Sequence, residues 1–140
     1  MSQKVTIDVK SSQDDGKEKE EISTENSGEL YQKRGTYYLK YEESAEGLEG
    51  VKTTVKIEEE KLTLIRQGAV RTIQNFIPDE RTKFDYQTPH GTLNLALEVE
   101  EFDFTIEERK GEIRLEYRIY SQDSVVSNNS LVIQYFCEEE

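Results

Sequence analysis

Arg66 is the residue of this sequence with the clearest capacity for binding chemistry. It follows Leu62 and Leu64 at every second position, so in a β-strand all three side chains face the same, apolar side. A charge that faces a protein interior needs a partner, because an unpaired buried charge is very costly. Two interpretations stay open. The guanidinium binds an anionic ligand group, or it forms an internal ion pair with a glutamate such as Glu43 or reaches water with its charged end.

Tyrosines form the second group of candidate binding residues. An inward tyrosine supplies a flat apolar wall and a hydroxyl that can orient a ligand. It equally supplies bulk that fills a small barrel, and filling is the interpretation we favour. Six tyrosines lie mostly at apolar positions of the predicted strands: Tyr31, Tyr37, Tyr41, Tyr86, Tyr117 and Tyr135. With Arg66, the candidate ligand-binding residues are Tyr37, Tyr41, Tyr86 and Tyr117.

Catalytic and metal-binding patterns are missing from the sequence. The single histidine, His90, lies in a predicted turn, and no Gly-x-Ser-x-Gly nucleophile motif accompanies it. The single cysteine, Cys137, lies on the apolar side of the last predicted strand, where a small buried thiol is expected. The run Asp14–Gly16 lacks the ligand spacing of a calcium loop. We therefore expect no cofactor, no metal site and no catalytic residues, and we interpret the protein as a non-enzyme.

The charge balance restricts the partners. The 140 residues carry 18 basic and 30 acidic side chains, a net charge of −12. This balance argues against DNA and against an anionic membrane surface. One stretch interleaves Lys33, Arg34 and Lys40 with tyrosines, a pattern that can serve single-stranded RNA. The neighbouring acids favour an exposed strand face instead, so we expect no RNA binding.

No address or anchor is visible in the chain. The first residues lack the continuous apolar region of a signal peptide, and no stretch approaches the length of a membrane span. The single cysteine allows no internal disulfide, which suits a reducing compartment. A cytoplasmic location is the expectation.

Apolar residues recur at every second position, the period of a half-buried strand. Breaks such as Thr88–Gly91, with Pro89 at the second position of the turn, separate the runs at intervals of mostly 8–12 residues. This pattern predicts an all-β antiparallel fold of about eight to ten strands, an up-and-down barrel or a sandwich, and short links favour the barrel. The alternating runs are Val5–Val9, Tyr37–Tyr41, Val51–Ile57, Leu93–Val99, Phe102–Ile106, Ile113–Ile119 and Leu131–Cys137.

The whole chain, residues 1–140, is expected to form one domain, close to the commonest domain size. Residues 12–27 are acidic and polar, and we interpret them as a solvated hairpin tip that leads into a polar strand. Residues 138–140 are three glutamates and are interpreted as a charged tail.

Several short motifs occur in an order that resembles the YwiB-like family, small uncharacterised β-barrel proteins of Gram-positive bacteria. The resemblance runs from Val5 to about Ile133 and implies a lipocalin-like, calycin-type closed barrel. It implies no activity, so no catalytic or ligand residue is carried over from it. The motifs are Gly28 with Tyr31, Gly35 with Tyr37-Tyr38, Tyr41-Glu42, Arg66-Gln67-Gly68, Tyr86-Gln87-Thr88-Pro89-His90-Gly91 and Leu115-Glu116-Tyr117.

Two functions follow as hypotheses. The first is a non-catalytic protein that binds a small amphipathic or anionic molecule in an internal cavity of several hundred cubic ångströms. The second is a protein-interaction module with a filled barrel, which acts through an exposed apolar patch on its outer surface. For the second, Val132 and Phe136 lie on the outer side of the last predicted strand, and a homodimer formed through this strand is part of the hypothesis.

Overall fold

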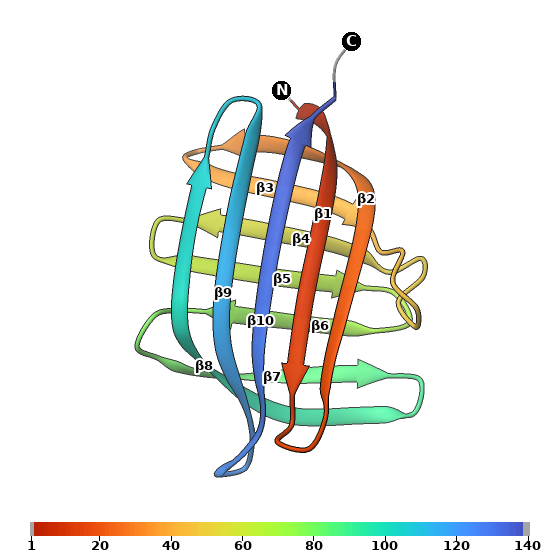
Figure 1. Cartoon of the computed structure of the whole chain (residues 1–140), viewed down its shortest axis with the longest axis vertical. Coiled ribbons are helices and arrows are strands. Elements are labelled where there is room, and N and C mark those ends of the chain that lie inside the picture. The colour runs from red at the N-terminus through yellow and green to blue at the C-terminus, as the bar shows by residue number, and fades with distance from the viewer. Residues whose placement is uncertain (1, 139–140) are drawn as a thin grey trace.

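The computed structural model describes residues 2–138, which form ten β-strands in a closed antiparallel barrel (Figure 1). Each strand pairs with the next one in the chain, and the last strand closes the barrel against the first. The all-β, up-and-down prediction is confirmed, with a strand count at the upper end of the expected range. The strands are β1 Ser2–Asp14, β2 Lys19–Lys33, β3 Thr36–Glu42, β4 Lys52–Glu58, β5 Lys61–Gln67, β6 Arg71–Phe76, β7 Arg81–Thr88, β8 Gly91–Ile106, β9 Lys110–Ser121 and β10 Ser124–Cys137.

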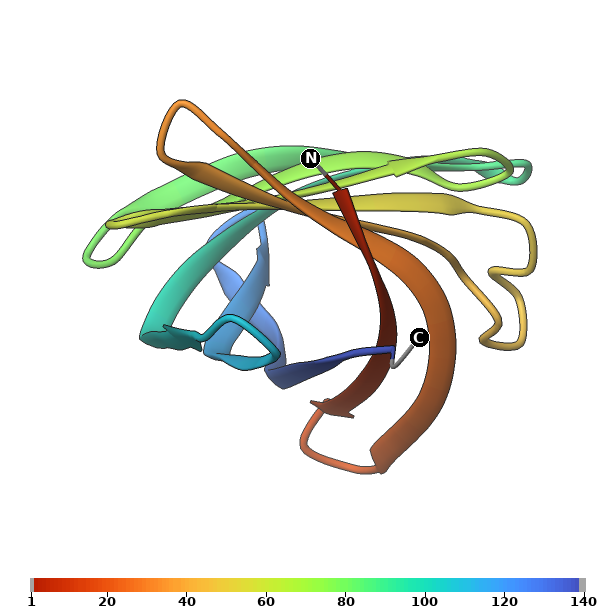
Figure 2. The same cartoon turned by 90° about the horizontal axis from the view of Figure 1, so that it is seen from above.

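The barrel is flattened into two layers whose strands cross at a steep angle (Figures 1 and 2). The front layer contains β9, β10, β1 and much of β2 and β8, and the back layer contains β3 to β7. The two longest strands, β2 with 15 residues and β8 with 16, pass from one layer into the other. In β8 a bulge between Val99 and Glu101 helps this bend. The bulge also explains why the apolar residues of β8 switch from odd to even positions after Val99.

Apolar side chains from all ten strands meet in one core between the layers. Tyr135 and Phe76 are the largest of the fully buried side chains. Two inward glycines make close packing possible: a Cβ at Gly111 would collide with the ring of Tyr135, and a Cβ at Gly28 would collide with the Lys40 carbonyl and the Ile7 side chain. Much of the interior is therefore packed with side chains, as in other small barrels.

The acidic segment after β1 forms a tight hairpin. The pairing of β1 with β2 continues to Asp14 opposite Lys19, so the tip is only Asp15–Glu18. The Asp15 carboxylate accepts hydrogen bonds from the backbone N–H groups of Lys17 and Glu18. Residues 19–23 of β2 are exposed, as a solvated strand requires. Of the three C-terminal glutamates, residues 139–140 lie outside the described chain.

The turn predicted at Thr88–Gly91 is confirmed, since Thr88 and Gly91 pair across it and Pro89 and His90 form its tip. The aliphatic run Leu93–Val99 behaves less uniformly than its alternation suggests. Leu97 and Val99 are buried, whereas Leu93 is 56% exposed. No helix in the described part of the chain is long and apolar enough to cross a membrane.

Candidate functional site

Strand register places the candidate binding residues in one row across the back layer. Each residue of the row lies opposite the next on the neighbouring strand, and all face the interior. We call this set the cross-strand row: Gly28, Tyr41, Thr53, Arg66, Thr72, Tyr86 and Leu93. The chain therefore brings three of the five candidates, Tyr41, Arg66 and Tyr86, into one line. The row changes from a charged and polar middle to an apolar end at Leu93.

Arg66 is paired with the acid that the ion-pair interpretation named. Its Nε lies 3.5 Å from Oε2 of Glu43, and the Glu43 side chain is only 4% exposed. The Thr53 hydroxyl donates a hydrogen bond of 2.6 Å to the same Glu43 oxygen. The Arg66 side chain keeps 19% of its surface exposed, and within residues 2–138 its Nε makes no hydrogen bond of good geometry. The cation is thus neutralised but incompletely hydrogen-bonded.

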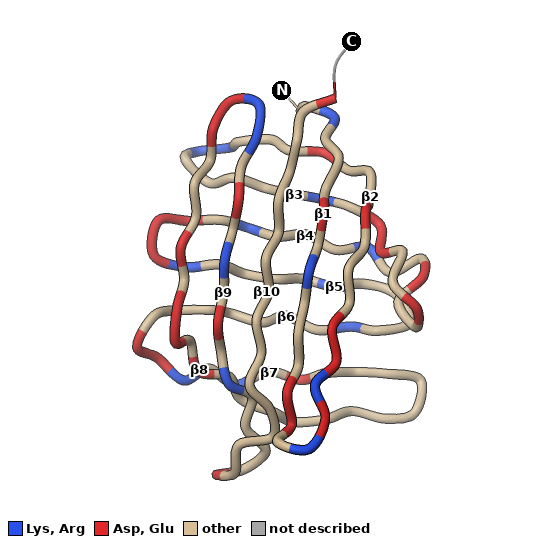
Figure 3. The backbone as a smooth tube through the Cα atoms, viewed as in Figure 1, with Lys and Arg blue, Asp and Glu red and all other residues tan. Residues whose placement is uncertain are grey.

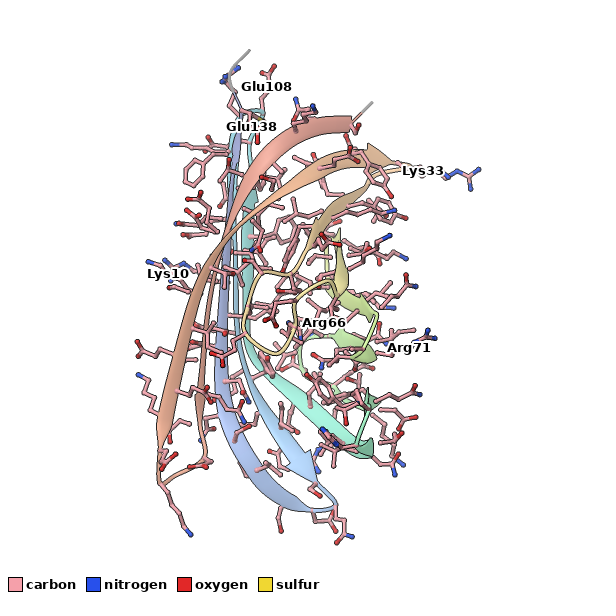
Figure 4. All side chains as sticks on the ribbon, turned by 90° about the vertical axis from the view of Figure 1, so that its right-hand side faces the viewer. Lys10, Lys33, Arg66, Arg71, Glu108 and Glu138 are labelled. Carbon is pink, nitrogen blue, oxygen red and sulfur yellow. The ribbon has the colours of Figure 1, made fainter. Side chains whose placement is uncertain are left out.

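Glu43 is held in place by the start of the β3–β4 loop. The Glu43 N–H donates to the Val51 carbonyl at 2.8 Å, which ties the two ends of the loop together. The next residue, Ser44, donates from both its N–H and its hydroxyl to Oδ1 of the buried Asn26 on β2. Asn26 of the front layer therefore anchors the loop that carries the acid. The cation, Arg66, comes from the back layer (Figure 4).

Tyr41 and Tyr117 surround this ion pair. Burial raises the pKa of Tyr41, and the Glu43 carboxylate raises it further, while Arg66 acts in the opposite direction. Burial also raises the pKa of Tyr117, which Arg66 again lowers in part and Tyr86 raises. The Tyr117 ring packs edge-on against Phe76, with centroids 4.9 Å apart. Tyr117 therefore joins the row from β9, on the opposite wall.

Tyr37 does not belong to this cluster. It faces the interior but lies near the other end of the barrel, opposite Gln32 and Ile57. There it lines a pocket of about 360 Å³ with Leu30 and Ile106. A second opening of about 980 Å³ at the same end is lined by polar residues near the chain termini.

The apolar end of the cross-strand row is open to solvent. Leu93 faces the interior by register, yet it is 56% exposed, and Ile22 on β2 faces the interior and is 41% exposed. Leu95 and Ile119, also inward, are only half-buried. Inward side chains are this exposed only where the opposite layer does not cover them. Leu93 could not be recognised as exposed from the sequence, because the alternation of Leu93–Val99 predicts burial, and Ile22 lies in the segment 12–27, which is interpreted as a polar strand.

The other residues considered in the sequence, His90, Cys137, Val132 and Phe136, lie outside the cross-strand row. His90 is exposed at its turn, and the half-buried Cys137 lies 3.4 Å from Oε1 of Gln3. On the outer face of β10, Val132 is half-buried and Phe136 is 44% exposed. Phe136 lines a small pocket of about 280 Å³. Because β10 pairs with both β9 and β1, it offers no free edge for another strand.

The basic and aromatic stretch on β2 and β3 splits between two faces. Tyr41 and Tyr37 face inward, whereas Tyr31 and Tyr38 stack on the outer face with ring centroids 4.9 Å apart. Lys40 lies over the ring of Tyr31 at 5.4 Å, and Lys56 lies over the ring of Tyr38 at 5.7 Å. The ring faces that would stack on nucleic-acid bases are thus already in contact with protein.

Buried tyrosines make stability depend on alkaline pH. Burial raises the pKa of Tyr135 to about 12 from 10, and its hydroxyl donates to the Glu107 carbonyl at 2.8 Å. Between pH 10 and pH 12 the Tyr135 hydroxyl is deprotonated in the unfolded chain but keeps its proton in the folded protein. We therefore expect the free energy of unfolding to be unaffected by these tyrosines below pH 10 and to fall as pH rises from 10 toward 12. Urea unfolding across this range, beside tyrosinate absorbance, measures the effect. Ionisation of all eight tyrosines near pH 10 without unfolding would contradict it.

The sequence and the fold of this chain are similar to those of known proteins. A family model described as "Domain of unknown function (DUF1934)" matches residues 7–133. The chain is 30% identical over 131 residues to the uncharacterized β-barrel protein YwiB of Bacillus subtilis (strain 168), covering 94% of this chain and 92% of that protein. The crystal structure of ywiB protein from Bacillus subtilis superposes with a TM-score of 0.88 at 28% identity, over 99% of this chain and 94% of that one.

Proposed function

Since this chain belongs to the DUF1934 family of YwiB-like β-barrel proteins, we propose a function from its own geometry: it binds a small amphipathic anion without catalysis. The observation that supports this most strongly is the cross-strand row, which runs from the incompletely hydrogen-bonded Arg66 to the exposed, inward-facing Leu93. The proposal includes a lipocalin-like mode of binding, with the ligand between the layers, and a cytoplasmic location.

Arg66 suits the head of such a ligand. Its guanidinium offers a planar set of donors that binds a carboxylate or phosphate in two parallel hydrogen bonds. Glu43 lies 3.5 Å from Nε, and Thr53 holds Glu43 independently. A second anion can therefore bind the guanidinium while Glu43 keeps a partner. The nearby hydroxyls of Tyr117 and Tyr86 supply further donors.

The rest of the row suits an apolar body. Arg66 and Leu93 are three strands apart, which is roughly 14 Å at the usual strand spacing. Tyr86 lies between them, and the half-buried Leu95 adds apolar surface near the open end. A medium-length alkyl chain fits this distance. Burying its surface together with that of Leu93 supplies the favourable free energy of binding.

Titration calorimetry with octanoate and octan-1-ol tests the proposal. We expect octanoate to bind one-to-one and the neutral alcohol, which has the same chain, to bind at least ten-fold more weakly. Absence of saturable octanoate binding would overturn the proposal. Equal affinity for octanoate and octan-1-ol would show that Arg66 does not recognise the anionic head of the ligand.

A second candidate function, a protein-interaction module, is favoured by Phe136, which is 44% exposed and lines a pocket of about 280 Å³. In this case the double variant Val132→Asp/Phe136→Asp converts a self-associated protein into a monomer and leaves the fold intact. Light scattering after size exclusion measures the mass of both proteins. A wild type that is monomeric at all concentrations, or a variant that still associates, argues against this face.

A further inference from the structure

The sheet is weakest between β6 and β7. Only two residue pairs join these strands, Arg71 with Gln87 and Thr72 with Tyr86. Farther along these strands, a side-chain hydroxyl takes the place of the backbone hydrogen bonds: the Thr82 hydroxyl donates to the Asn75 carbonyl at 2.6 Å. Thr72 likewise donates to the Asp85 carbonyl at 2.8 Å. The two strands therefore part, and the backbone between them is not covered by regular pairing.

A groove of about 620 Å³ lies along this seam; outward-facing residues of the back layer form most of its lining, and the inward-facing Arg66, Thr72 and Phe84 complete it. Its volume falls within the range of small-molecule sites. Ile65 and Ile73 pair across β5 and β6 in its middle, and Ile73 is 58% exposed, the most exposed large apolar side chain of the described residues. Amide side chains of Gln67, Asn75 and Gln87 complete much of its polar lining.

A basic residue stands at each end of this groove. Arg71 lies at one end, opposite Gln87, and Lys83 lies at the other, beside Asn75. Arg71 points outward from the back layer, away from the interior that Arg66 faces (Figure 4). Within residues 2–138, five ion pairs form between other side chains, and neither Arg71 nor Lys83 takes part in one. Asp85 is the one acid among the groove residues.

The groove belongs to a face whose charge differs from that of the whole chain. On the outer side of β3 to β7, seven basic residues stand against three acidic ones, although the chain has a net charge of −12. Figure 3 shows the basic residues spread over these strands. The basic residues are Lys40, Lys52, Lys56, Lys61, Arg71, Arg81 and Lys83, and the acidic residues are Glu42, Glu58 and Asp85.

We propose that this seam groove is a second binding site, for an elongated small molecule with an anionic group at each end and an apolar segment between them. Four residues of extended strand separate Asn75, beside Lys83, from Arg71, which is about 13 Å. A single compact anion reaches both cations only when the two side chains fold toward each other over the groove. A long dianion reaches both and covers Ile65 and Ile73 with its apolar middle. Arg66 and Thr72 of the cross-strand row also line the groove, but the two cations that hold the dianion, Arg71 and Lys83, lie outside the row.

The test is an NMR titration of the full chain with decanedioate, in which the backbone amide signals locate the ligand. We expect saturable shifts at Arg71, Ile73 and Lys83. Succinate, which carries the same charge but is too short to span the groove, should bind at least five-fold more weakly. The exposed-site variants Arg71→Gln and Lys83→Gln should each weaken decanedioate binding at least five-fold. Lys40→Gln removes the same charge from the same face outside the groove and should leave binding unchanged.

Four results would overturn the proposal. The first is no saturable shift with decanedioate. The second is equal binding of succinate, and the third is an equal loss of binding in Lys40→Gln, since either reveals general charge attraction. The fourth is a set of shifts confined to Tyr86 and Leu93, which places the dianion in the interior site. Octanoate binding in Arg71→Gln separates the two sites, because the interior proposal requires it to stay at the wild-type value.

Discussion

Replacement of Arg66 with methionine is expected to lower the free energy of unfolding by about 3 kcal/mol, the lower end of the range for breaking a buried ion pair. The loss arises because Glu43, with 4% of its side chain exposed, stays buried without its cation. We take the lower end of this energy range because Arg66 Nε lies 3.5 Å from the Glu43 carboxylate and the Arg66 side chain is 19% exposed. For a chain of this size, the corresponding fall in melting temperature is roughly 10 °C.

A double-mutant cycle separates the ion pair from the loss of packing. Glu43→Gln/Arg66→Met removes both charges and leaves side chains of similar size, so we expect it to be more stable than Arg66→Met alone. The difference measures the cost of the unpaired carboxylate. Urea unfolding followed by circular dichroism suits a protein without tryptophan. A loss below about 1 kcal/mol in Arg66→Met, as for an exposed pair, would mean that Glu43 does not depend on Arg66.

Leu93→Asp is expected to weaken octanoate binding at least ten-fold with little effect on stability. Leu93 is already 56% exposed, so the substitution removes little buried apolar surface from the folded protein. In the complex, by contrast, the aspartate replaces an apolar contact and brings a negative charge toward an anionic ligand. Titration calorimetry of the variant with octanoate measures the change.

Ile73→Asp is the matched control for this prediction. Ile73 is 58% exposed on the opposite side of the back layer, in the seam groove. The same change of side chain there should leave octanoate affinity unaltered and should weaken decanedioate binding. If Leu93→Asp and Ile73→Asp lower octanoate affinity equally, the effect is one of net charge, and the row is not the binding site.

The fold could be predicted because alternation determines which side of a strand faces the core. The change from odd to even apolar positions between Val99 and Phe102 marks the bulge in β8, and Pro89 marks the turn before that strand. The lengths of the two long strands could not be predicted in the same way. They depend on the crossing of the two layers, which local periodicity does not encode.

The site could be predicted only in part. Alternation along the strands predicts that four of the candidate side chains face the interior, and the structure brings these four together: Arg66, Tyr41, Tyr86 and Tyr117. Tyr37 has the same parity but lies toward the other end of the barrel, a difference that only the register of neighbouring strands determines. The exposure of Leu93 depends on whether the front layer covers it, which no pattern within β8 reveals.

Net charge was the least informative part of the sequence. The value of −12 argues against anionic partners for the molecule as a whole. Alternation, however, sends Arg71 and Lys83 to the outer face of the back layer, where no carboxylate of the described chain pairs with them. Local charge on one face, rather than the sum over the chain, determines where an anion binds at physiological salt.

Native mass spectrometry tests the central claim most directly, because it counts ligands on the folded protein. Wild type, Leu93→Asp and Ile73→Asp are incubated with octanoate, transferred to volatile buffer and compared with their denatured masses. We predict one bound octanoate on wild type and on Ile73→Asp, lost on denaturation, and none on Leu93→Asp. A wild type at its bare mass, or an adduct that survives in Leu93→Asp, would contradict the claim that the open end of the barrel binds an amphipathic anion.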